Sequence, residues 1–198
     1  MPRLKGNTKE IILEKSLVLF STKGFEAVSI RDIAAEVGIG NSALYKHYAS
    51  KQAIFDALVA ELKEEYLQSC SFVSEKIRGV DAVKDACLKM FDYQTGNERI
   101  VRFRQILLIE QFRNPHMRDL YREFFVDIPL GRLTSIFATL QKKELMIKGD
   151  PYVYAMELYA PFYLFHFVEH DRDLKEKFKL HAENFSRYFI SEKTHRHL

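Results

Sequence analysis

Four polar or aromatic side chains, Asn41, Ser42, Tyr45 and Lys46, lie close together in the sequence and have the chemistry needed to contact nucleic acid. An asparagine amide can pair with adenine, and a lysine ammonium can bind the acceptors of guanine. Hydroxyl groups can bind either bases or phosphates. A helix over 41–48 would turn all four side chains outward and present them to a ligand on one side.

These side chains are positioned by another helix, predicted over 30–37, which directly precedes them in the chain. Ser29 followed by Asp32 forms a capping-box-like start, and apolar residues then recur at helical spacing. Gly38 suits the left-handed backbone conformation that ends a helix. Two helices joined in this way predict a helix-turn-helix, whose second helix enters the major groove of DNA. An ordinary helical hairpin is the alternative.

The details of the sequence favour the DNA-binding interpretation. The run GFxxxSIRDIAxxxG over 24–38, with LYKHYxSK over 44–51, closely resembles the DNA-binding domain of the TetR/AcrR family of transcriptional regulators. The resemblance implies that Tyr45, His47 and Lys51 bind phosphates. Tyr45 and His47 could instead be packing residues.

Other candidates for DNA contact follow from residue type and position. Ser29 lies at a helix N-terminus, where a hydroxyl can bind a phosphate. Lys46 could either contact DNA or be a solvated surface charge. The candidates for contact with base edges are Asn41, Ser42 and Lys46. Because one such domain reads only a few base pairs, we expect a homodimer on a pseudo-palindromic site in double-stranded DNA.

The composition is that of a globular protein. Of 198 residues, 47% are hydrophobic and 29% charged, and the formal net charge is +3. The whole excess lies in residues 1–52, which carry eight Lys or Arg against five acids. Cys70 and Cys87 have no zinc-binding spacing, and no stretch is long and apolar enough to span a bilayer. We therefore expect a cytoplasmic protein with no metal, no cofactor and no membrane partner.

The rest of the chain predicts an all-α fold. A three-helix DNA-binding domain over 1–50 would be followed by a helical ligand-binding and dimerisation domain over 51–198. Pro129 and Pro161 should each kink or split a helix, because proline lacks a donor and clashes with the preceding turn. The further helices are predicted over 51–77, 80–93, 98–113, 117–144, 151–170 and 174–191.

The second domain is rich in aromatic residues: 15 of the 26 Phe and Tyr residues lie between 91 and 170. Such a surplus is compatible with a small-molecule site, although core packing explains it equally well. The family resemblance implies an effector, and the scarcity of lone charges on the apolar faces favours an apolar or aromatic one. The candidate lining residues are Phe91, Phe103, Phe112, Tyr121, Tyr159, Tyr163 and His166.

The last two helices are the candidates for the dimer contact. The segment 152–168 is apolar on nearly every side and must be covered, and 178–189 carries an apolar stripe. The resemblance implies that they pair with their symmetry mates in a four-helix bundle, around a twofold axis. Burial within one subunit is the alternative.

The sequence thus predicts a DNA-binding transcriptional regulator, most simply a repressor released by its effector, rather than an enzyme. A dimeric regulator without an effector is the second interpretation. A metal-dependent hydrolase is a remote third, because His166, Glu169 and His170 spell the HxxEH motif of inverted zinc peptidases. A third ligand for zinc is not apparent in the sequence, which argues against this interpretation.

Overall fold

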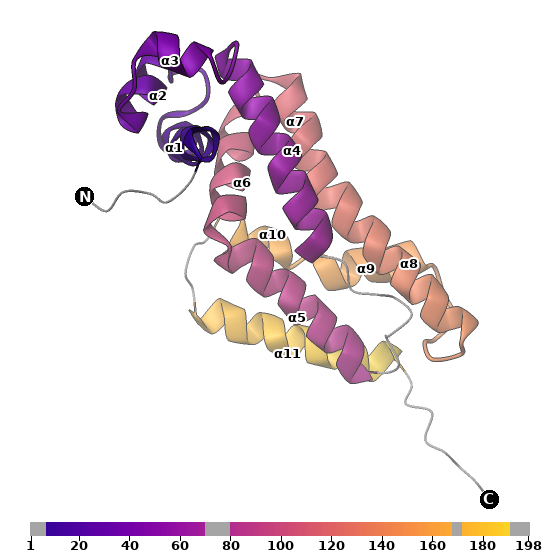
Figure 1. Ribbon diagram of the computed structural model, residues 1–198. Helices are drawn as coiled ribbons and strands as arrows, with labels where there is room; N and C mark the ends of the chain where they lie inside the picture. Colours follow the sequence, from indigo (N-terminus) through magenta and orange to yellow (C-terminus); the bar gives the residue numbers. More distant parts are fainter. Residues whose placement is uncertain (1–6, 70–79, 168–171, 191–198) are drawn as a thin grey trace, which may run out of the picture. The chain divides into compact units, whose positions relative to one another are not determined.

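The computed structural model describes residues 7–69, 80–167 and 172–190 (Figure 1). The described residues form helices and one isolated bridge, between Met146 and Ile190, which confirms the all-α prediction. The predicted end of the helix over 51–77 lies outside the described residues. The helices are α1 (Thr8–Lys23), α2 (Ile30–Val37), α3 (Asn41–Tyr45), α4 (Lys51–Ser69), α5 (Val80–Gly96), α6 (Glu98–Glu110), α7 (Pro115–Arg122), the π-helix η2 (Glu123–Asp127), α8 (Ile128–Lys142), α9 (Pro151–Tyr159), α10 (Phe162–Phe165) and α11 (Arg172–Phe189).

The chain divides into two compact units, and each is built from two separate stretches of sequence. The first unit comprises residues 1–68 and 98–121, and the second comprises 69–97 and 122–198. Helices α1 to α4 therefore share a unit with α6 and most of α7. The functional boundary that the sequence predicts at residue 50 stays a prediction.

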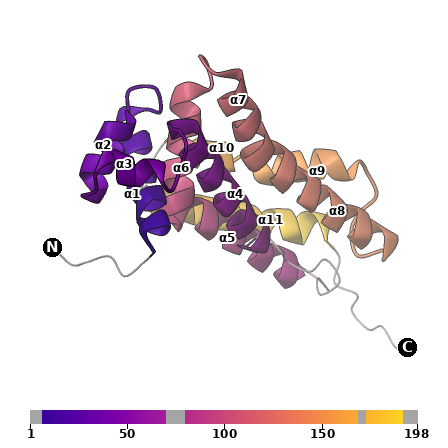
Figure 2. The ribbon, with the colours of Figure 1, turned by 45° about the horizontal axis from the view of Figure 1, so that its top comes forward.

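The first unit is built around aromatic rings at the corner that joins α1, α2 and α4. Asn7 and Glu10 form the capping box that starts α1, and α1 packs against α2 and α6. The Phe25 ring lies 5.1 Å from that of Phe20 and 5.2 Å from that of Phe55, measured between centroids. Phe25 and Val28 thus fill the corner, being 5% and 1% exposed. Figures 1 and 2 both show α3 beside α2 in this unit.

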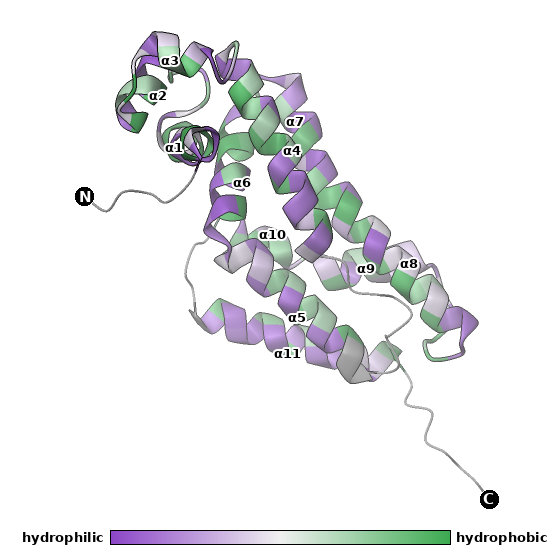
Figure 3. Ribbon diagram, in the orientation of Figure 1, coloured by the Kyte–Doolittle hydropathy of each residue, from purple (hydrophilic) through white to green (hydrophobic). Residues whose placement is uncertain are grey.

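In the second unit α8 packs against α9, and α5 packs against α11. Figure 3 shows that α11 is largely hydrophilic on its visible side, whereas its buried residues include Phe178 and Phe185. The amphipathic pattern predicted for the last helix is therefore found. Among the described residues, no helix combines the length and the apolar character that crossing a bilayer requires.

The two helix-breaking prolines of the second unit act in different ways. At Pro161 the helix splits, so that α9 ends at Tyr159 and α10 begins at Phe162. At Pro129 the interruption takes the form of the π-helix η2, in which the Ile128 N–H bonds to the carbonyl oxygen five residues earlier. In an α-helix the N–H of residue 129 would bond to the Phe125 carbonyl, and proline has no such donor.

Candidate nucleic-acid interface

The turn between α2 and α3 is set by Gly38. Its backbone adopts φ 78° and ψ 32°, the left-handed conformation expected from the sequence. The Gly38 and Ile39 N–H groups both bond to the Ala34 carbonyl oxygen, at 3.0 Å each, and so close the end of α2. Gly40 then adopts an extended conformation and α3 begins at Asn41. This geometry fixes the direction in which α3 leaves α2.

The predicted DNA-contacting residues of α3 lie on its open side. Asn41, Ser42 and Lys46 are exposed, and the Tyr45 ring is 54% exposed. Leu44 is fully buried and holds the opposite face of the helix. The α-helix ends at Tyr45, earlier than predicted, although backbone bonds from the N–H groups of residues 47 and 48 to the Leu44 carbonyl continue the turn. This surface offers an amide, two hydroxyls and an ammonium to a ligand.

The other predicted contacts have partners within the chain. The Ser29 hydroxyl donates to Asp32 Oδ2 at 2.6 Å and accepts from the Asp32 N–H at 3.2 Å. The Ser29 hydroxyl and the Ser29 N–H, which lies 2.8 Å from Asp32 Oδ2, both donate to the Asp32 carboxylate and lower its pKa, since they favour its charged form. His47 is half-buried. The phosphate-binding roles predicted for Ser29 and His47 stay predictions.

Lys51, the first residue of α4, forms side-chain hydrogen bonds with the connection between α1 and α2. Its Nζ donates to the Phe25 carbonyl oxygen at 2.7 Å and to the Glu26 carbonyl oxygen at 3.3 Å. The same Nζ lies 4.3 Å from the centroid of the Phe25 ring, in cation–π geometry. Lys51 thus holds the corner of the helix-turn-helix domain, whereas its predicted contact with a phosphate stays a prediction.

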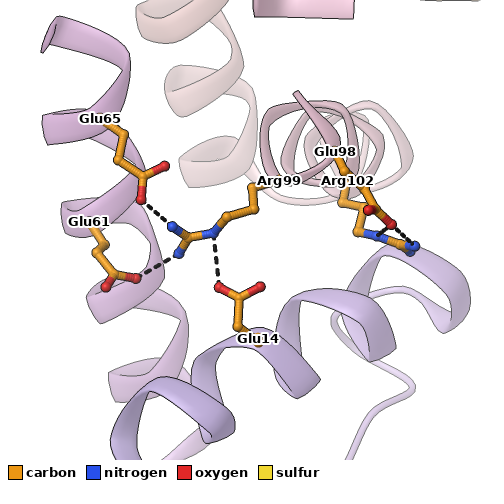
Figure 4. Close-up of polar contacts among 6 residues, drawn as sticks. All are labelled: Glu14, Glu61, Glu65, Glu98, Arg99 and Arg102. Carbon is orange, nitrogen blue, oxygen red and sulfur yellow. Dashed lines mark hydrogen bonds and ion pairs between the residues drawn. The ribbon is translucent and has the colours of Figure 1, made fainter. Parts of the chain in front are cut away.

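Two charged residues of α6 contact the same domain, and the sequence analysis missed both. Arg99 forms ion pairs with Glu14 of α1 (2.9 Å), with Glu61 of α4 (2.7 Å) and with Glu65 of α4 (Figure 4). Glu110, which is 5% exposed, accepts a hydrogen bond of 2.8 Å from the Phe25 N–H. Glu110 follows Leu107 on the buried stripe of α6, and a charged residue on an apolar stripe is the signal that could have found it.

The seven predicted effector residues are divided between the two units. Phe103 is buried in the first unit, with its ring 6.2 Å from that of Phe55. Phe112 also belongs to the first unit, and its side chain is 88% exposed, so among the described residues it does not line an enclosed site. Tyr121 is half-buried in α7. The remaining four, Phe91, Tyr159, Tyr163 and His166, lie in the second unit.

These four residues belong to one aromatic cluster. The Phe91 ring stacks on that of Phe178 at 4.2 Å, and the Tyr163 ring lies 5.2 Å from that of His166. The Tyr163 hydroxyl donates to the Phe125 carbonyl oxygen at 3.3 Å, and the Tyr159 hydroxyl lies within hydrogen-bond distance of both that oxygen, at 3.0 Å, and Gln94 Oε1, at 3.1 Å. These hydroxyls can supply the donor that Pro129 cannot provide. Burial raises the pKa of Tyr163 above its ordinary value.

The HxxEH motif is only partly described. His166 is buried at the end of α10, whereas Glu169 and His170 lie outside the described residues. Over the part of the chain that the structure describes, no group of three or more His, Cys, Asp or Glu side chains is placed to hold a metal ion. The fold and the contacts above define a helix-turn-helix protein, with an exposed face on its second helix.

The comparisons with known proteins agree with that class. Residues 12–58 match the family described as bacterial regulatory proteins, tetR family. The Probable HTH-type transcriptional regulator YttP of Bacillus subtilis is 26% identical over 147 residues, which is 73% of this chain and 62% of that protein. The nucleoid occlusion factor SlmA of Mannheimia succiniciproducens is 25% identical over 50% of this chain and 46% of that protein. The chain therefore spans about half to three-fifths of the length of these relatives.

Solved structures share the fold over almost the whole chain. The SmeT–triclosan complex has a TM-score of 0.74 at 18% identity, covering 94% of this chain and 93% of that one. SmeT is described as the repressor of a multidrug efflux pump of Stenotrophomonas maltophilia. The fatty acid degradation regulator FadR of Bacillus halodurans has a TM-score of 0.71 at 13% identity, covering 99% of this chain and 100% of that one. The predicted resemblance is thus confirmed: the chain carries the N-terminal domain of the tetR family, within a fold that these regulators share.

Proposed function

We propose that this protein is a sequence-specific DNA-binding transcriptional regulator, and that it acts as a repressor in the compartment that holds the DNA, the cytoplasm. The observation that carries the proposal is the exposed face of α3. It presents Asn41, Ser42, Tyr45 and Lys46, while Leu44 on the opposite face of the helix is buried. Its N-terminal residues are those that a recognition helix uses on base edges. The match to the tetR family over residues 12–58 supports the same role.

The experiment is the selection of bound sequences from a random DNA pool, followed by the salt dependence of affinity for the selected site. We expect a twofold-symmetric site and a steep salt dependence, because phosphate contacts release counterions. Asn41→Ala should relax the preference at one base position, whereas Tyr45→Ala should weaken binding to every sequence. Lys46→Ala should also relax the preference at one base position, whereas its control Lys177→Ala, which removes an exposed cation of α11, should leave the preference unchanged. Failure to enrich any sequence would contradict the proposal.

The proposal includes a homodimer formed through the last helices. Large apolar side chains are exposed along α9, on α10 and just after it, and a surface of this kind is typical of an interface: Tyr152 46%, Val153 54%, Met156 50%, Leu164 53% and Phe167 73%. A second copy of the chain would bury them around a twofold axis. Met156→Glu should shift the protein toward monomer in sedimentation velocity, whereas the neighbouring Glu157→Gln should not. A monomeric wild-type protein would contradict this part.

The proposed effector is a small apolar or aromatic molecule that binds the aromatic cluster of the second unit. The support is the gathering of Phe91, Tyr159, Tyr163 and His166 in one cluster, together with the likeness to SmeT, whose complex with triclosan is known. An effector that binds the conformation with low DNA affinity would release the DNA by population shift. Triclosan is the first probe: it should raise the melting temperature and lower affinity for the selected site.

A regulator without an effector is the second candidate, and a specific observation favours it. The hydroxyls of Tyr159 and Tyr163 already lie within hydrogen-bond distance of the Phe125 carbonyl, and Phe91 stacks closely on Phe178. A cluster satisfied in this way can be core packing alone. If triclosan and a panel of other aromatic compounds leave both the melting temperature and the DNA affinity unchanged, this second candidate holds. Neither candidate requires catalysis, and the proteins of this family are generally not enzymes.

A further inference from the structure

The connection between α1 and α2 is held from two sides by charged groups of other helices. On one side Glu110 Oε1, at the end of α6, accepts from the Phe25 N–H at 2.8 Å and lies 3.5 Å from the Glu26 nitrogen. On the other side Lys51 Nζ, at the start of α4, donates to the carbonyl oxygens of the same two residues. The two residues therefore meet a carboxylate with their donors and an ammonium with their acceptors. Hydrogen bonds to charged groups are about twice as strong as neutral ones.

Gly24 is the residue that lets the carboxylate approach. Its backbone has φ 83°, a conformation that favours glycine, and a Cβ built there would lie 3.1 Å from Glu110 Oε1. A side chain at position 24 would thus meet both backbone strain and the carboxylate. The absence of a side chain at Gly24 therefore leaves the space that the Glu110 carboxylate occupies.

The burial of Glu110 makes the contact specific. A buried carboxylate is costly unless hydrogen bonds compensate for its lost hydration, so Glu110 favours the position of α6 in which the Phe25 N–H reaches it. At the other end of α6 the Arg99 side chain is 24% exposed, and salt screens its pairs with Glu14, Glu61 and Glu65 more strongly. The two ends of α6 therefore differ. Arg99 attracts α1 and α4 through ion pairs that salt screens, whereas the buried Glu110 carboxylate needs the Phe25 N–H at hydrogen-bond distance.

We propose that Glu110 is a positioning residue, through which the end of α6 sets the orientation of the helix pair α2–α3 for DNA binding. The proposal rests on the proposed function, because it makes DNA affinity depend on the Glu110–Phe25 contact. Ser29, which caps α2, follows Phe25 by four residues, so a shift of the Phe25 peptide moves the start of α2 directly. Glu110 is not itself a predicted DNA contact and acts through its hydrogen bond with Phe25.

The first arm of the experiment needs no DNA and measures amide hydrogen exchange in the full-length protein. Glu110→Ala should speed exchange at Phe25 and through α2, while α8 in the second unit keeps its wild-type rates. Glu110→Gln should recover part of the protection, since both N–H groups approach the same oxygen, Oε1, which the amide retains, although its neutral hydrogen bond is weaker than that of the carboxylate. Unchanged exchange at Phe25 and α2 in Glu110→Ala would overturn the proposal. Loss of protection in Glu110→Gln equal to that in Glu110→Ala would overturn it too.

The second arm measures affinity for the selected DNA site, at a temperature where circular dichroism shows every variant folded. Glu110→Ala should bind at least about tenfold more weakly than wild type, and Glu110→Gln should stay within about threefold of it. Ile136→Val in α8 is the control for general destabilisation and should leave affinity unchanged. A folded Glu110→Ala with wild-type affinity would overturn the proposal. If the wild type itself selects no sequence, the proposed function fails, and the exchange arm alone decides whether Glu110 positions α2.

Discussion

Both units pack around aromatic rings, and they differ in their charged contacts: Glu110 of α6 in the first unit is buried, whereas the Lys175–Asp92 pair between α11 and α5 in the second is exposed. In the first unit, α6 reaches α1, α4 and the connection before α2 through charged side chains, Arg99 and Glu110. In the second unit, α5, α10 and α11 meet through the rings of Phe91, Phe162 and Phe178. Charged contacts depend on direction and distance, whereas ring packing depends on volume. The proposed function needs α3 in one orientation, which directional contacts favour, and it needs a second unit that accommodates an effector, which ring packing favours.

The largest expected effect is in the ring cluster. Phe91→Ala removes a side chain that is 1% exposed and contacts three other rings, so it should lower the free energy of unfolding by about 3–5 kcal/mol. Denaturant unfolding followed by circular dichroism measures the change. Phe112→Ala, at a side chain that is 88% exposed, is the control and should change the free energy by less than about 0.5 kcal/mol. A loss below about 1 kcal/mol for Phe91→Ala would show that the cluster is loosely packed.

The next effect tests the corner of the first unit. Gly24→Ala should destabilise by about 1–3 kcal/mol, because alanine disfavours φ 83° and its Cβ would approach Glu110 Oε1. Gly131→Ala is the matched control. Gly131 lies in α8, and a Cβ there meets nothing within 4 Å, so the change should stabilise the protein by about 0.5–1 kcal/mol. Equal effects of the two substitutions in thermal or denaturant unfolding would show that position 24 has room for a side chain beside Glu110.

A smaller effect is expected from the hydroxyls that serve η2. Tyr159→Phe and Tyr163→Phe each remove one hydroxyl beside the Phe125 carbonyl and should cost about 0.5–1.5 kcal/mol. The loss should be greater for Tyr159, which is fully buried, than for the half-buried Tyr163. The double variant should cost more than the sum of the two, because it leaves the carbonyl with neither hydroxyl. Strict additivity of the three measured values would argue that the two hydroxyls act independently.

The smallest expected effect is on the pH dependence of stability, at two carboxylates whose pKa values shift in opposite directions, Glu14 and Glu36. Desolvation by burial, with help from Glu61 and Glu65, raises the pKa of Glu14 above 4.5, although Arg99 opposes the shift. The folded state then keeps the proton longer than the unfolded state, so this group lowers stability as pH rises through its unfolded and then its folded pKa. Glu14→Gln should therefore gain melting temperature relative to wild type as the pH rises above the unfolded pKa of a glutamate, which scanning calorimetry over a pH series measures.

Glu36 is the matched control with the opposite sign. Its hydrogen bond and ion pair with Lys15, at 2.8 Å, lower its pKa, so its contribution is present above the unfolded pKa and is lost as pH falls through the folded one. Glu36→Gln should lose melting temperature relative to wild type over the same rise in pH. The same sign for both variants would contradict the assigned environments.

Much of the first unit could be predicted from the sequence because local rules decide it. The capping boxes at Asn7 and Ser29 and the left-handed turn at Gly38 each depend on residues within a few positions of one another. The exposed face of α3 follows from its period and from Leu44. The split at Pro161 is local for the same reason, because the missing donor and the clash lie within one helix.

The sequence by itself determined the all-α class, the helix-turn-helix and the resemblance to the TetR/AcrR family. Only the tertiary structure decided which predicted effector residues meet, since burial places Phe103 beside Phe55 and leaves Phe112 exposed. It also decided the partners of Glu110, which lie 84 and 85 positions away along the chain. Helical periodicity shows that a side chain faces inward, but it does not show which distant segment lies opposite. That pairing depends on how the helices pack, and packing is a property of the whole chain.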